Sequence, residues 1–120
     1  MTPAKEKLGK ESLIIGKEDG NGQIKLEFAK LRRAVLTLRS INHPLRKQML
    51  VMLEQKKRMT VTEIYDKLKL EQSVASQHLA IMRRADVVKT NRDGKFIFYS
   101  VNAKRIEEVT ALVEQLAQQG

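Results

Sequence analysis

Residues 73–84, SVASQHLAIMRR, combine the side-chain types that a helix needs to contact the groove of a nucleic acid. In a helix that turns about 100° per residue, one narrow face is apolar: Ala75, Leu79 and Met82. The opposite face is small, polar and basic: Ser73, Gln77, Ala80 and Arg84. Small residues permit close approach, Ser and Gln can bond base edges, and Arg can pair with phosphates or guanine. The stretch therefore predicts a DNA-recognition helix, although an ordinary amphipathic surface helix would show the same two faces.

The candidate DNA contacts lie on this helix and on a basic turn that follows it. Gln77 can form a bidentate pair with adenine. His78 lies about 60° from the apolar stripe, so a structural, hydrogen-bonded histidine is the alternative to a DNA contact. Instead of contacting DNA, Arg83 could pair with an acidic residue on the protein surface. Arg92 and Lys95 could instead be exposed to solvent without any partner. The full set of candidate contacts is Gln72, Ser73, Val74, Ser76, Gln77, His78, Arg83, Arg84, Arg92 and Lys95.

The preceding segments predict the elements that would position this helix. Pro44 suits the first turn of a helix that continues through HPLRKQMLVMLEQ. Thr60 and Glu63 have the spacing of a capping box, which opens a short helix ending near Lys69. Ser73 is predicted to cap the next helix after a tight turn. Two short helices joined by a turn of about four residues form a helix-turn-helix.

The following segments predict a β-hairpin and a last helix. Residues 87–92 and 95–101 have strand-like patterns and are linked by Asp93-Gly94, a strong hairpin signal. The tip of this hairpin is basic. Asn102 is predicted to cap the C-terminal helix, which has an apolar side: Ile106, Val109, Leu112, Val113 and Leu116.

Two regions are predicted at the N-terminal end. Residues 1–22 are rich in Gly and charge and predict a flexible tail. From Gln23 a helical pattern begins, and residues 23–120 are predicted to form one domain. The apolar stripe of this first helix is Ile24, Phe28, Leu31, Val35 and Leu38. Further apolar residues lie off the stripe, which indicates a second contact such as a partner subunit.

Composition narrows the function classes. The chain has 120 residues, 23 basic and 14 acidic, with a net charge of +9, so an acidic partner such as nucleic acid is expected. It has no cysteine, which excludes disulfides and thiolate metal sites. The sequence has neither a Gly-rich phosphate loop nor a cluster of His with acidic residues, so we expect neither an enzyme nor a cofactor. No apolar run approaches the length of a membrane span, so we expect a cytoplasmic protein without a membrane partner.

The predicted order is four helices, a hairpin and a helix, which is a winged helix-turn-helix (ααααββα), mainly α with a β-hairpin wing. The run TVTEIYDKLKLEQSVASQHLAIMRRADVV and the wing RDGKFIFYSV resemble the ArsR/SmtB family of bacterial transcriptional regulators. NHPLRKQMLVML is similar to the family's second helix. The resemblance covers Ile41 to Val101 and rests on Ser76, His78, Leu79 and Tyr99 together with the Asp-Gly turn.

This resemblance implies a homodimeric repressor that binds double-stranded DNA at an inverted repeat. The first and last helices would form the dimer interface through Ile24, Phe28, Leu31, Val35, Val109, Leu112, Val113 and Leu116. The excess apolar surface on these helices fits that expectation. The alternative function is a winged helix that binds proteins inside a larger assembly, because a fold does not determine function.

The chain departs from the family's pattern in its turn and in its sensing residues. Asp86 replaces the usual Gly after the recognition helix, and Asp tolerates the left-handed backbone that this turn needs. Metal-sensing members carry a cysteine pair where this chain has Thr60 and Thr62. The second family metal site matches Ala103, Arg105, Leu116 and Gln119, none of them a plausible zinc ligand. We therefore expect neither metal nor thiol sensing, and no residue pattern identifies a small-molecule inducer. A constitutive or partner-controlled DNA binder is a further alternative.

Overall fold

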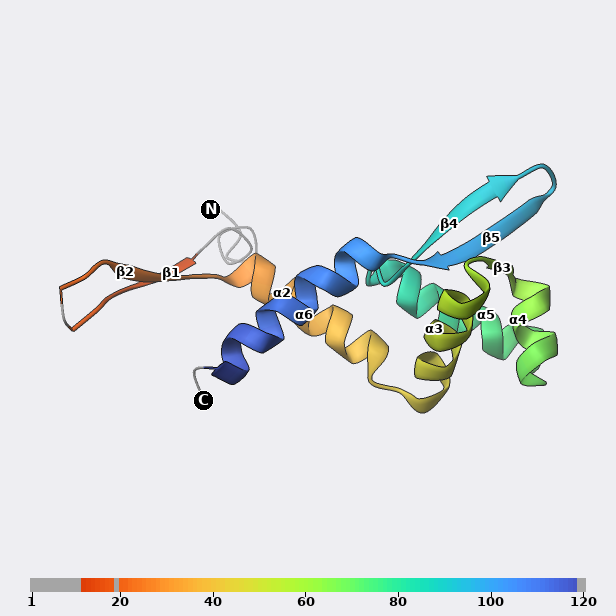
Figure 1. Cartoon of the computed structure of the whole chain (residues 1–120), viewed down its shortest axis with the longest axis horizontal. Coiled ribbons are helices and arrows are strands. Elements are labelled where there is room, and N and C mark those ends of the chain that lie inside the picture. Colours follow the sequence, from red (N-terminus) through yellow and green to blue (C-terminus); the bar gives the residue numbers. More distant parts are fainter. Residues whose placement is uncertain (1–11, 19, 119–120) are drawn as a thin grey trace, which may run out of the picture. The chain divides into compact units, whose positions relative to one another are not determined.

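The computed structural model describes residues 12–18 and 20–118 of the chain. The elements in chain order are β1 (Ser12–Gly16), β2 (Gln23–Glu27), α2 (Phe28–Ile41), α3 (Pro44–Lys56), β3 (Met59–Thr60), α4 (Val61–Leu68), α5 (Gln72–Arg84), β4 (Val88–Asp93), β5 (Phe96–Val101) and α6 (Ala103–Gln118) (Figure 1). The chain forms two compact units, residues 1–36 and 37–120, whose boundary lies inside α2. In the described residues, no helix is long and apolar enough to cross a membrane.

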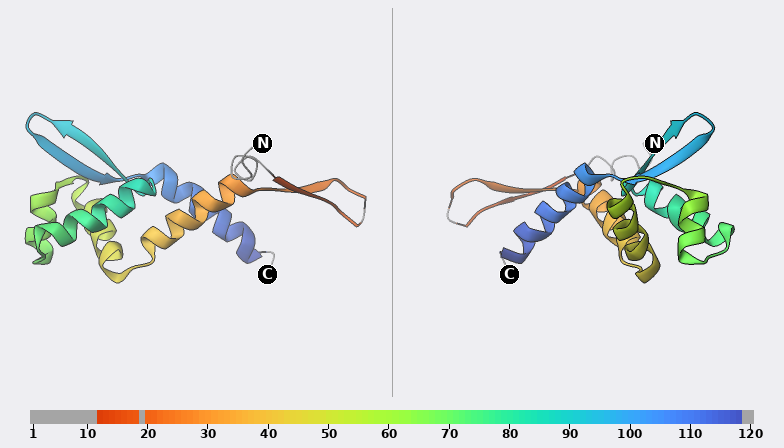
Figure 2. Two further views of the ribbon diagram at one scale, coloured as in Figure 1. Left: turned by 180° about the vertical axis from the view of Figure 1, so that it is seen from behind. Right: turned by 45° about the vertical axis from the view of Figure 1, so that its right-hand side comes forward.

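The second unit is a winged helix-turn-helix, as predicted. Strands β4 and β5 form an antiparallel hairpin, the wing, that extends beyond α4 and α5 (Figure 2). The core lies between α3, α4, α5 and the base of the wing, and its fully buried side chains include Met49, Leu53, Ile64, Ala75, Leu79, Met82 and Val87. This core fixes the face that α5 presents to solvent.

Strand β3 is an element that the sequence did not predict. It pairs antiparallel with β5, with Met59 opposite Tyr99 and Thr60 opposite Phe98, so the sheet order is β3-β5-β4. Two residues are too few to produce a recognisable strand pattern. Because Thr60 is also the N-cap of α4, this short strand ties the start of the helix-turn-helix to the wing.

Side-chain hydrogen bonds to backbone amides mark the starts of α3 and α4. Pro44 is the first residue of α3, and Nδ1 of His43 accepts a bond from the Leu45 amide at 3.1 Å. The predicted capping box of α4 is confirmed: the Glu63 amide donates to Thr60 Oγ1 and the Thr60 amide donates to Glu63 Oε1. These bonds satisfy amides that the first turn of a helix leaves free.

The predicted cap of α5 is wrong. The N-cap is Glu71, which makes no side-chain capping bond, and Ser73 lies inside the first turn. The helix already starts at Gln72 because the Glu71 carbonyl accepts bonds from the amides of Val74 and Ala75. The side chain of Ser73 is therefore not engaged in capping and is exposed.

The turn after α5 agrees with the expectation for Asp86. The helix ends at Arg84, and Asp86 has a left-handed backbone with φ of 61°. This turn reverses the chain so that Val87 and Val88 enter the core. At the other end of β4, the two-residue loop is Gly94-Lys95, one position later than predicted, with Gly94 at φ of 64°. Glycine occupies the first central position of type II′ hairpin turns because this position requires a positive φ.

The first unit differs from the prediction for the N-terminal region. Residues 12–16 form a strand where a flexible tail is predicted, and residues 23–27 form its antiparallel partner where a helix is predicted. Leu13 lies opposite Leu26, and Ile15 opposite Ile24, so one face of this hairpin is apolar. The correct signal was the alternation of apolar residues, which has a period of two. The expectation for residues 1–11 lies outside the described residues, and the mobility of the segment in solution stays a prediction.

Candidate DNA-binding surface

The outer face of α5 presents mostly polar, small and basic side chains, with the apolar Ile81 among them. Ala75, Leu79 and Met82 are fully buried and anchor the helix, as the i, i+4, i+7 spacing predicts. The exposed residues are Gln72, Ser73, Ser76, Gln77, Ala80, Ile81, Arg83 and Arg84. No acidic residue lies between Gln72 and Arg84. This face can approach a polyanion without electrostatic repulsion.

The two arginines at the end of α5 reach into solvent. Nε of Arg84 donates to the Ala80 carbonyl at 3.4 Å, which leaves the rest of its guanidinium free to donate. Arg83 makes no ion pair with an acid among the described residues, so the alternative of a surface carboxylate partner is not seen there. Helix ends that carry paired arginines suit phosphate contacts.

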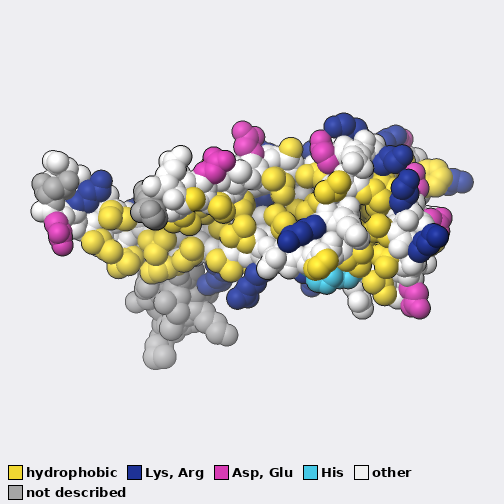
Figure 3. Space-filling model, turned by 60° about the horizontal axis from the view of Figure 1, so that its bottom comes forward, with side chains coloured by type: hydrophobic (Ala, Val, Ile, Leu, Met, Phe, Trp, Pro, Cys, Tyr) yellow, Lys and Arg dark blue, Asp and Glu magenta, His cyan; other side chains and the backbone are white. Residues whose placement is uncertain are grey.

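His78 is a half-buried residue held by the protein itself. Its Nδ1 lies 3.2 Å from Nη1 of Arg46, and its ring centroid lies 4.8 Å from that of His43. Nε of Arg46 also donates to the Ser40 carbonyl at 2.6 Å, so Arg46 connects the end of α2 to α5. Histidine surface is visible on the face shown in Figure 3, beside hydrophobic side chains.

The same surroundings lower the pKa of His78. Burial disfavours the charged ring of His78, and its electrostatic interactions with His43 and Arg46 lower the pKa in the same direction. Because a guanidinium can only donate, its contact requires an unprotonated Nδ1. The neutral ring is therefore part of the packing between α3 and α5.

Val74, also a predicted contact, is half-buried. Val74 and His78 both lie at the edge of the exposed face of α5.

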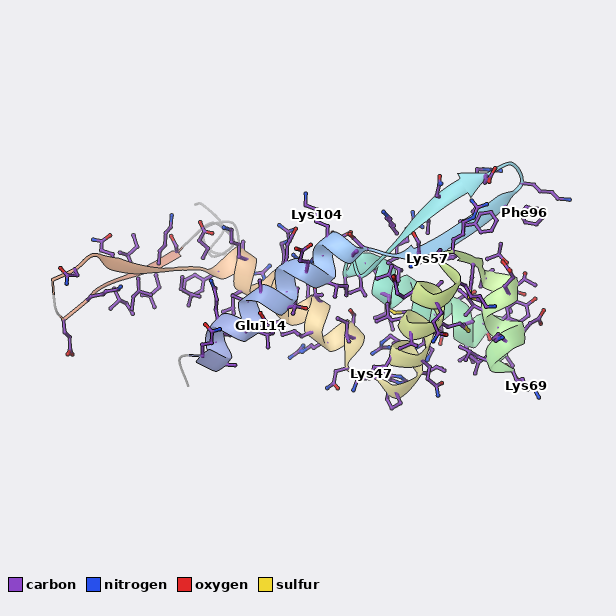
Figure 4. The ribbon with its side chains drawn as sticks, in the orientation of Figure 1. Lys47, Lys57, Lys69, Phe96, Lys104 and Glu114 are labelled. Carbon is purple, nitrogen blue, oxygen red and sulfur yellow. The ribbon has the colours of Figure 1, made fainter. Side chains whose placement is uncertain are left out.

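The wing carries the other predicted contacts. Arg92 is exposed and its Nε donates to the Gly94 carbonyl at 3.3 Å. Lys95 is in the loop, with Nζ 5.4 Å from the ring centroid of Phe96. Phe96 and Ile97 are each about half exposed, and Figure 4 shows Phe96 near the tip of the wing. The tip therefore combines two basic side chains with apolar surface, which the charge pattern alone did not indicate.

Arg58, between α3 and β3, contacts the wing and was not among the predicted site residues. Its guanidinium carbon lies 3.9 Å from the centroid of the Phe98 ring, and Nη1 pairs with Asp93 Oδ2 at 3.2 Å. An exposed pair of this kind contributes at most about 1 kcal/mol. Its effect is to hold the basic segment 56–58 beside the wing.

Two of the positions that match the family's metal sites, Thr60 and Arg105, make other contacts. Thr60 is in the capping box, and Arg105 donates to Thr37 Oγ1 and to Glu108. Gln119 lies outside the described residues. In residues 12–18 and 20–118 no group of three His, Cys, Asp or Glu side chains is placed to hold a metal ion.

The predicted dimer residues are mostly exposed apolar side chains. Six of them are more than one-third exposed: Ile24, Leu31, Val35, Leu112, Val113 and Leu116. Phe28 is half-buried. Val109 is buried inside the second unit, so it supports the base of α6 rather than its surface. Ile24 lies on β2 and not on the helix that was predicted to carry it.

Comparison with known proteins supports the same assignment. Residues 43–90 match the family model described as "Bacterial regulatory protein, arsR family". The transcriptional repressor PagR of Bacillus anthracis is 37% identical over 92 residues, which are 77% of this chain and 92% of PagR. The transcriptional activator HlyU of Vibrio cholerae is 32% identical over 84 residues, 70% of this chain and 77% of HlyU.

Solved structures of these two proteins have the same fold. The crystal structure of PagR aligns with a TM-score of 0.61 and 38% identity, covering 72% of this chain and 99% of that chain. The structure of HlyU from Vibrio cholerae aligns with a TM-score of 0.57 and 33% identity, covering 75% and 94%. The chain thus belongs to the ArsR family of winged helix-turn-helix transcriptional regulators.

Proposed function

We propose that the protein is a homodimeric repressor that binds a double-stranded inverted repeat through α5 and the wing. The observation that carries this proposal is the outer face of α5, which is exposed, mainly polar and basic, and contains no carboxylate. In a helix-turn-helix the second helix enters the major groove, where side chains can distinguish all four base pairs.

Each part of the surface has a proposed role. Gln77 and Ser73 contact base edges, and Gln72, Ser76, Arg83 and Arg84 contact bases or phosphates around them. Val74 and His78 border this contact, with His78 also serving to orient α5 through Arg46. Arg92 and Lys95 contact phosphates across the minor groove.

The homodimer is supported by the exposed apolar residues of α2 and α6. Leu31, Val35, Leu112 and Leu116 are each more than one-third exposed, which is more than a solvated helix surface needs. A two-fold dimer would present two α5 helices about one DNA turn apart, so the operator would be an inverted repeat.

Control by a metal or a thiol is not part of the proposal. The chain contains no cysteine, and Thr60, which stands at one of the family's cysteine positions, has a structural role in the capping box. Repression is favoured by the similarity to PagR, which is named a repressor, over 92% of its length. HlyU, which is named an activator, shows that similar chains include activators as well as repressors.

A selection of bound genomic fragments tests the proposal. The fragments are recovered on the purified protein, sequenced, and then titrated by mobility shift against a scrambled duplex of equal length. We expect an inverted repeat bound at least about 1000-fold more tightly than the scrambled duplex. A reporter gene behind that site should lose expression when the protein is present. Equal affinity for both duplexes would remove the sequence-specific function and favour the protein-binding alternative.

A further inference from the structure

The tip of the wing exposes apolar side chains in the middle of a basic surface. Phe96 is 51% exposed and Ile97 is 50% exposed, directly after the two-residue loop Gly94-Lys95. Two of the three phenylalanines of the chain, Phe96 and Phe98, lie on this one strand, and Figure 4 shows Phe96 near the loop. Neighbouring apolar side chains that stay in solvent are typical of a surface that contacts another molecule.

The ring of Phe96 rests on a fixed support. Side chains two positions apart on a strand share a face, and the ring centroids of Phe96 and Phe98 lie 6.3 Å apart with the planes inclined by 55°. Phe98 is half-buried, and the guanidinium carbon of Arg58 lies 3.9 Å from the centroid of its ring. Arg58 and Phe98 therefore hold the base of the tip, while much of the Phe96 ring faces solvent.

The charges around Phe96 favour a polyanion. Arg92 and Lys95 are exposed, and Nζ of Lys95 lies 5.4 Å from the centroid of the Phe96 ring. Residues 88–101 contain a single carboxylate, that of Asp93, which pairs with Nη1 of Arg58 at 3.2 Å. The tip is thus an apolar ring beside cations, and its one acidic group is paired. Such a surface suits DNA, where the cations can reach phosphates while the ring meets the bases.

We propose that Phe96 enters the minor groove beside each half-site and wedges between two base pairs, so that the DNA kinks at that step. This inference rests on the DNA-binding function proposed above and gives the wing a role beyond phosphate contact. Apolar side chains that are inserted in this way from the minor groove, Phe among them, kink a duplex by roughly 20–90°. The loop has only two residues, so little backbone lies beyond Phe96 to obstruct its entry.

The wedge predicts a sequence preference outside the half-sites. Pyrimidine–purine steps such as TA and CA unstack easily, whereas A-tracts are stiff. A phenyl ring has no hydrogen-bonding group for base edges, so Phe96 would select a step by its deformability and not by its donors and acceptors. We therefore expect a pyrimidine–purine step in each flank, at the position that the tip of the wing reaches.

Bending of the operator tests the wedge. The inverted repeat, extended on both sides, carries a donor and an acceptor fluorophore at its two ends, and energy transfer reports the distance between them. We expect the wild type to bend the DNA by at least about 20° per half-site. Phe96→Ala should lose most of this bend, and Phe96→Leu, which keeps an apolar wedge, should retain most of it. Val51→Ala trims an apolar residue of α3 that is 58% exposed, and as the matched control it should bend the DNA as the wild type does.

Unstacking is measured by replacing single bases of the flank with 2-aminopurine, whose fluorescence rises when it leaves the stack. We expect a rise at one step of each flank with the wild type and none with Phe96→Ala. Changing that step to AA should weaken binding of the wild type at least about threefold and leave the affinity of Phe96→Ala within about twofold. Phe96→Ala should also keep the wild-type salt slope, because it removes no charge.

The outcomes separate this inference from the proposed function. A wild type that binds the inverted repeat selectively but leaves it straight would overturn the wedge and leave the DNA-binding function standing, and so would a Phe96→Ala protein that bends the repeat equally. If that variant bends and binds DNA normally but no longer represses a reporter gene, the tip contacts a protein instead, which also overturns the wedge. A wild type without preference for any duplex would overturn both.

Discussion

Gln77 is an exposed residue of α5 whose amide can both donate and accept, which a bidentate pair with a base requires. We expect Gln77→Ala to relax sequence preference at one position of each half-site by about 1–3 kcal/mol. Affinity for unrelated duplex should stay nearly unchanged, since no charge is lost. Titration of the wild-type and variant proteins against a set of single-base operator changes measures this.

The matched control for that variant is Gln48→Ala, which removes the same group from the exposed surface of α3. It should leave the preference at every position intact. A Gln77→Ala protein that keeps full discrimination would assign base reading to other residues of α5.

His78 makes stability depend on pH. Its pKa is lowered, by burial first and then by His43 and Arg46, so the unfolded chain binds a proton at a higher pH than the folded protein does. The stabilisation is complete above the ordinary histidine pKa of about 6.5, and it is lost as the pH falls below that value toward the folded pKa. We expect the urea midpoint of the wild type to decrease between pH 7.5 and 5.5.

The variant His78→Gln keeps an acceptor for Arg46 but cannot titrate, and it should show a smaller decrease over the same range. His43→Gln is the companion variant, because it removes a neighbouring imidazole and leaves His78 in place. Identical decreases in the wild type and in His78→Gln would show that other groups set the pH dependence.

At the scale of elements, we propose that the basic residues of the wing contribute affinity for any DNA sequence and that α5 contributes sequence specificity. Lys95 is in the wing loop, and its proposed contact is to phosphates, which are the same for every sequence. We expect Lys95→Ala to weaken binding to operator and to unrelated duplex about equally. It should also reduce the slope of log affinity against log salt by roughly one. Anisotropy titrations at several salt concentrations measure both quantities.

Lys104→Ala is the control, since Lys104 is an exposed lysine of α6 outside the surface formed by α5 and the wing. It removes the same charge and should leave the salt slope unchanged. A loss confined to the operator with Lys95→Ala would mean that the wing reads bases.

The elements also differ in how well the sequence predicted them. Helices α3 to α5 and the wing were predictable because caps, turn residues and periodicity agree. Pro44 and the pair Thr60 with Glu63 mark helix starts that the structure confirms. The N-cap of α5 is Glu71 instead of the predicted Ser73, and the loop of the wing lies one position later than predicted. The exposure of Gln77 and Arg84 followed from helix geometry alone. The contact between His78 and Arg46 did not, because the two residues are 32 positions apart and only packing brings them together.

The N-terminal hairpin was not predicted, for a different reason. Ile24, Phe28, Leu31 and Val35 fit a helical period, and this pattern concealed the alternation of Ile24 with Leu26. Pairing with Leu13 and Ile15 decides the strand, and it depends on residues on the far side of a turn. Figure 1 shows β1 running beside β2 in this hairpin. Strand pairing between distant residues is not visible in a window of one segment.

At the scale of the whole molecule, dimerisation couples the two proposed half-site contacts. A monomer would bind a half-site only, whereas a dimer adds the second contact without a second loss of translational freedom. We therefore expect Leu112→Glu, which puts a charge into the exposed apolar side of α6, to give monomers in sedimentation. The same variant should bind the full operator at least about tenfold more weakly and a half-site with nearly wild-type affinity. Ile14→Glu, an equally drastic change at an exposed isoleucine outside the predicted interface, should leave both affinities unchanged. A Leu112→Glu dimer of normal strength would move the interface away from this side of α6, and weaker binding to the half-site as well would indicate a folding defect and not a loss of coupling.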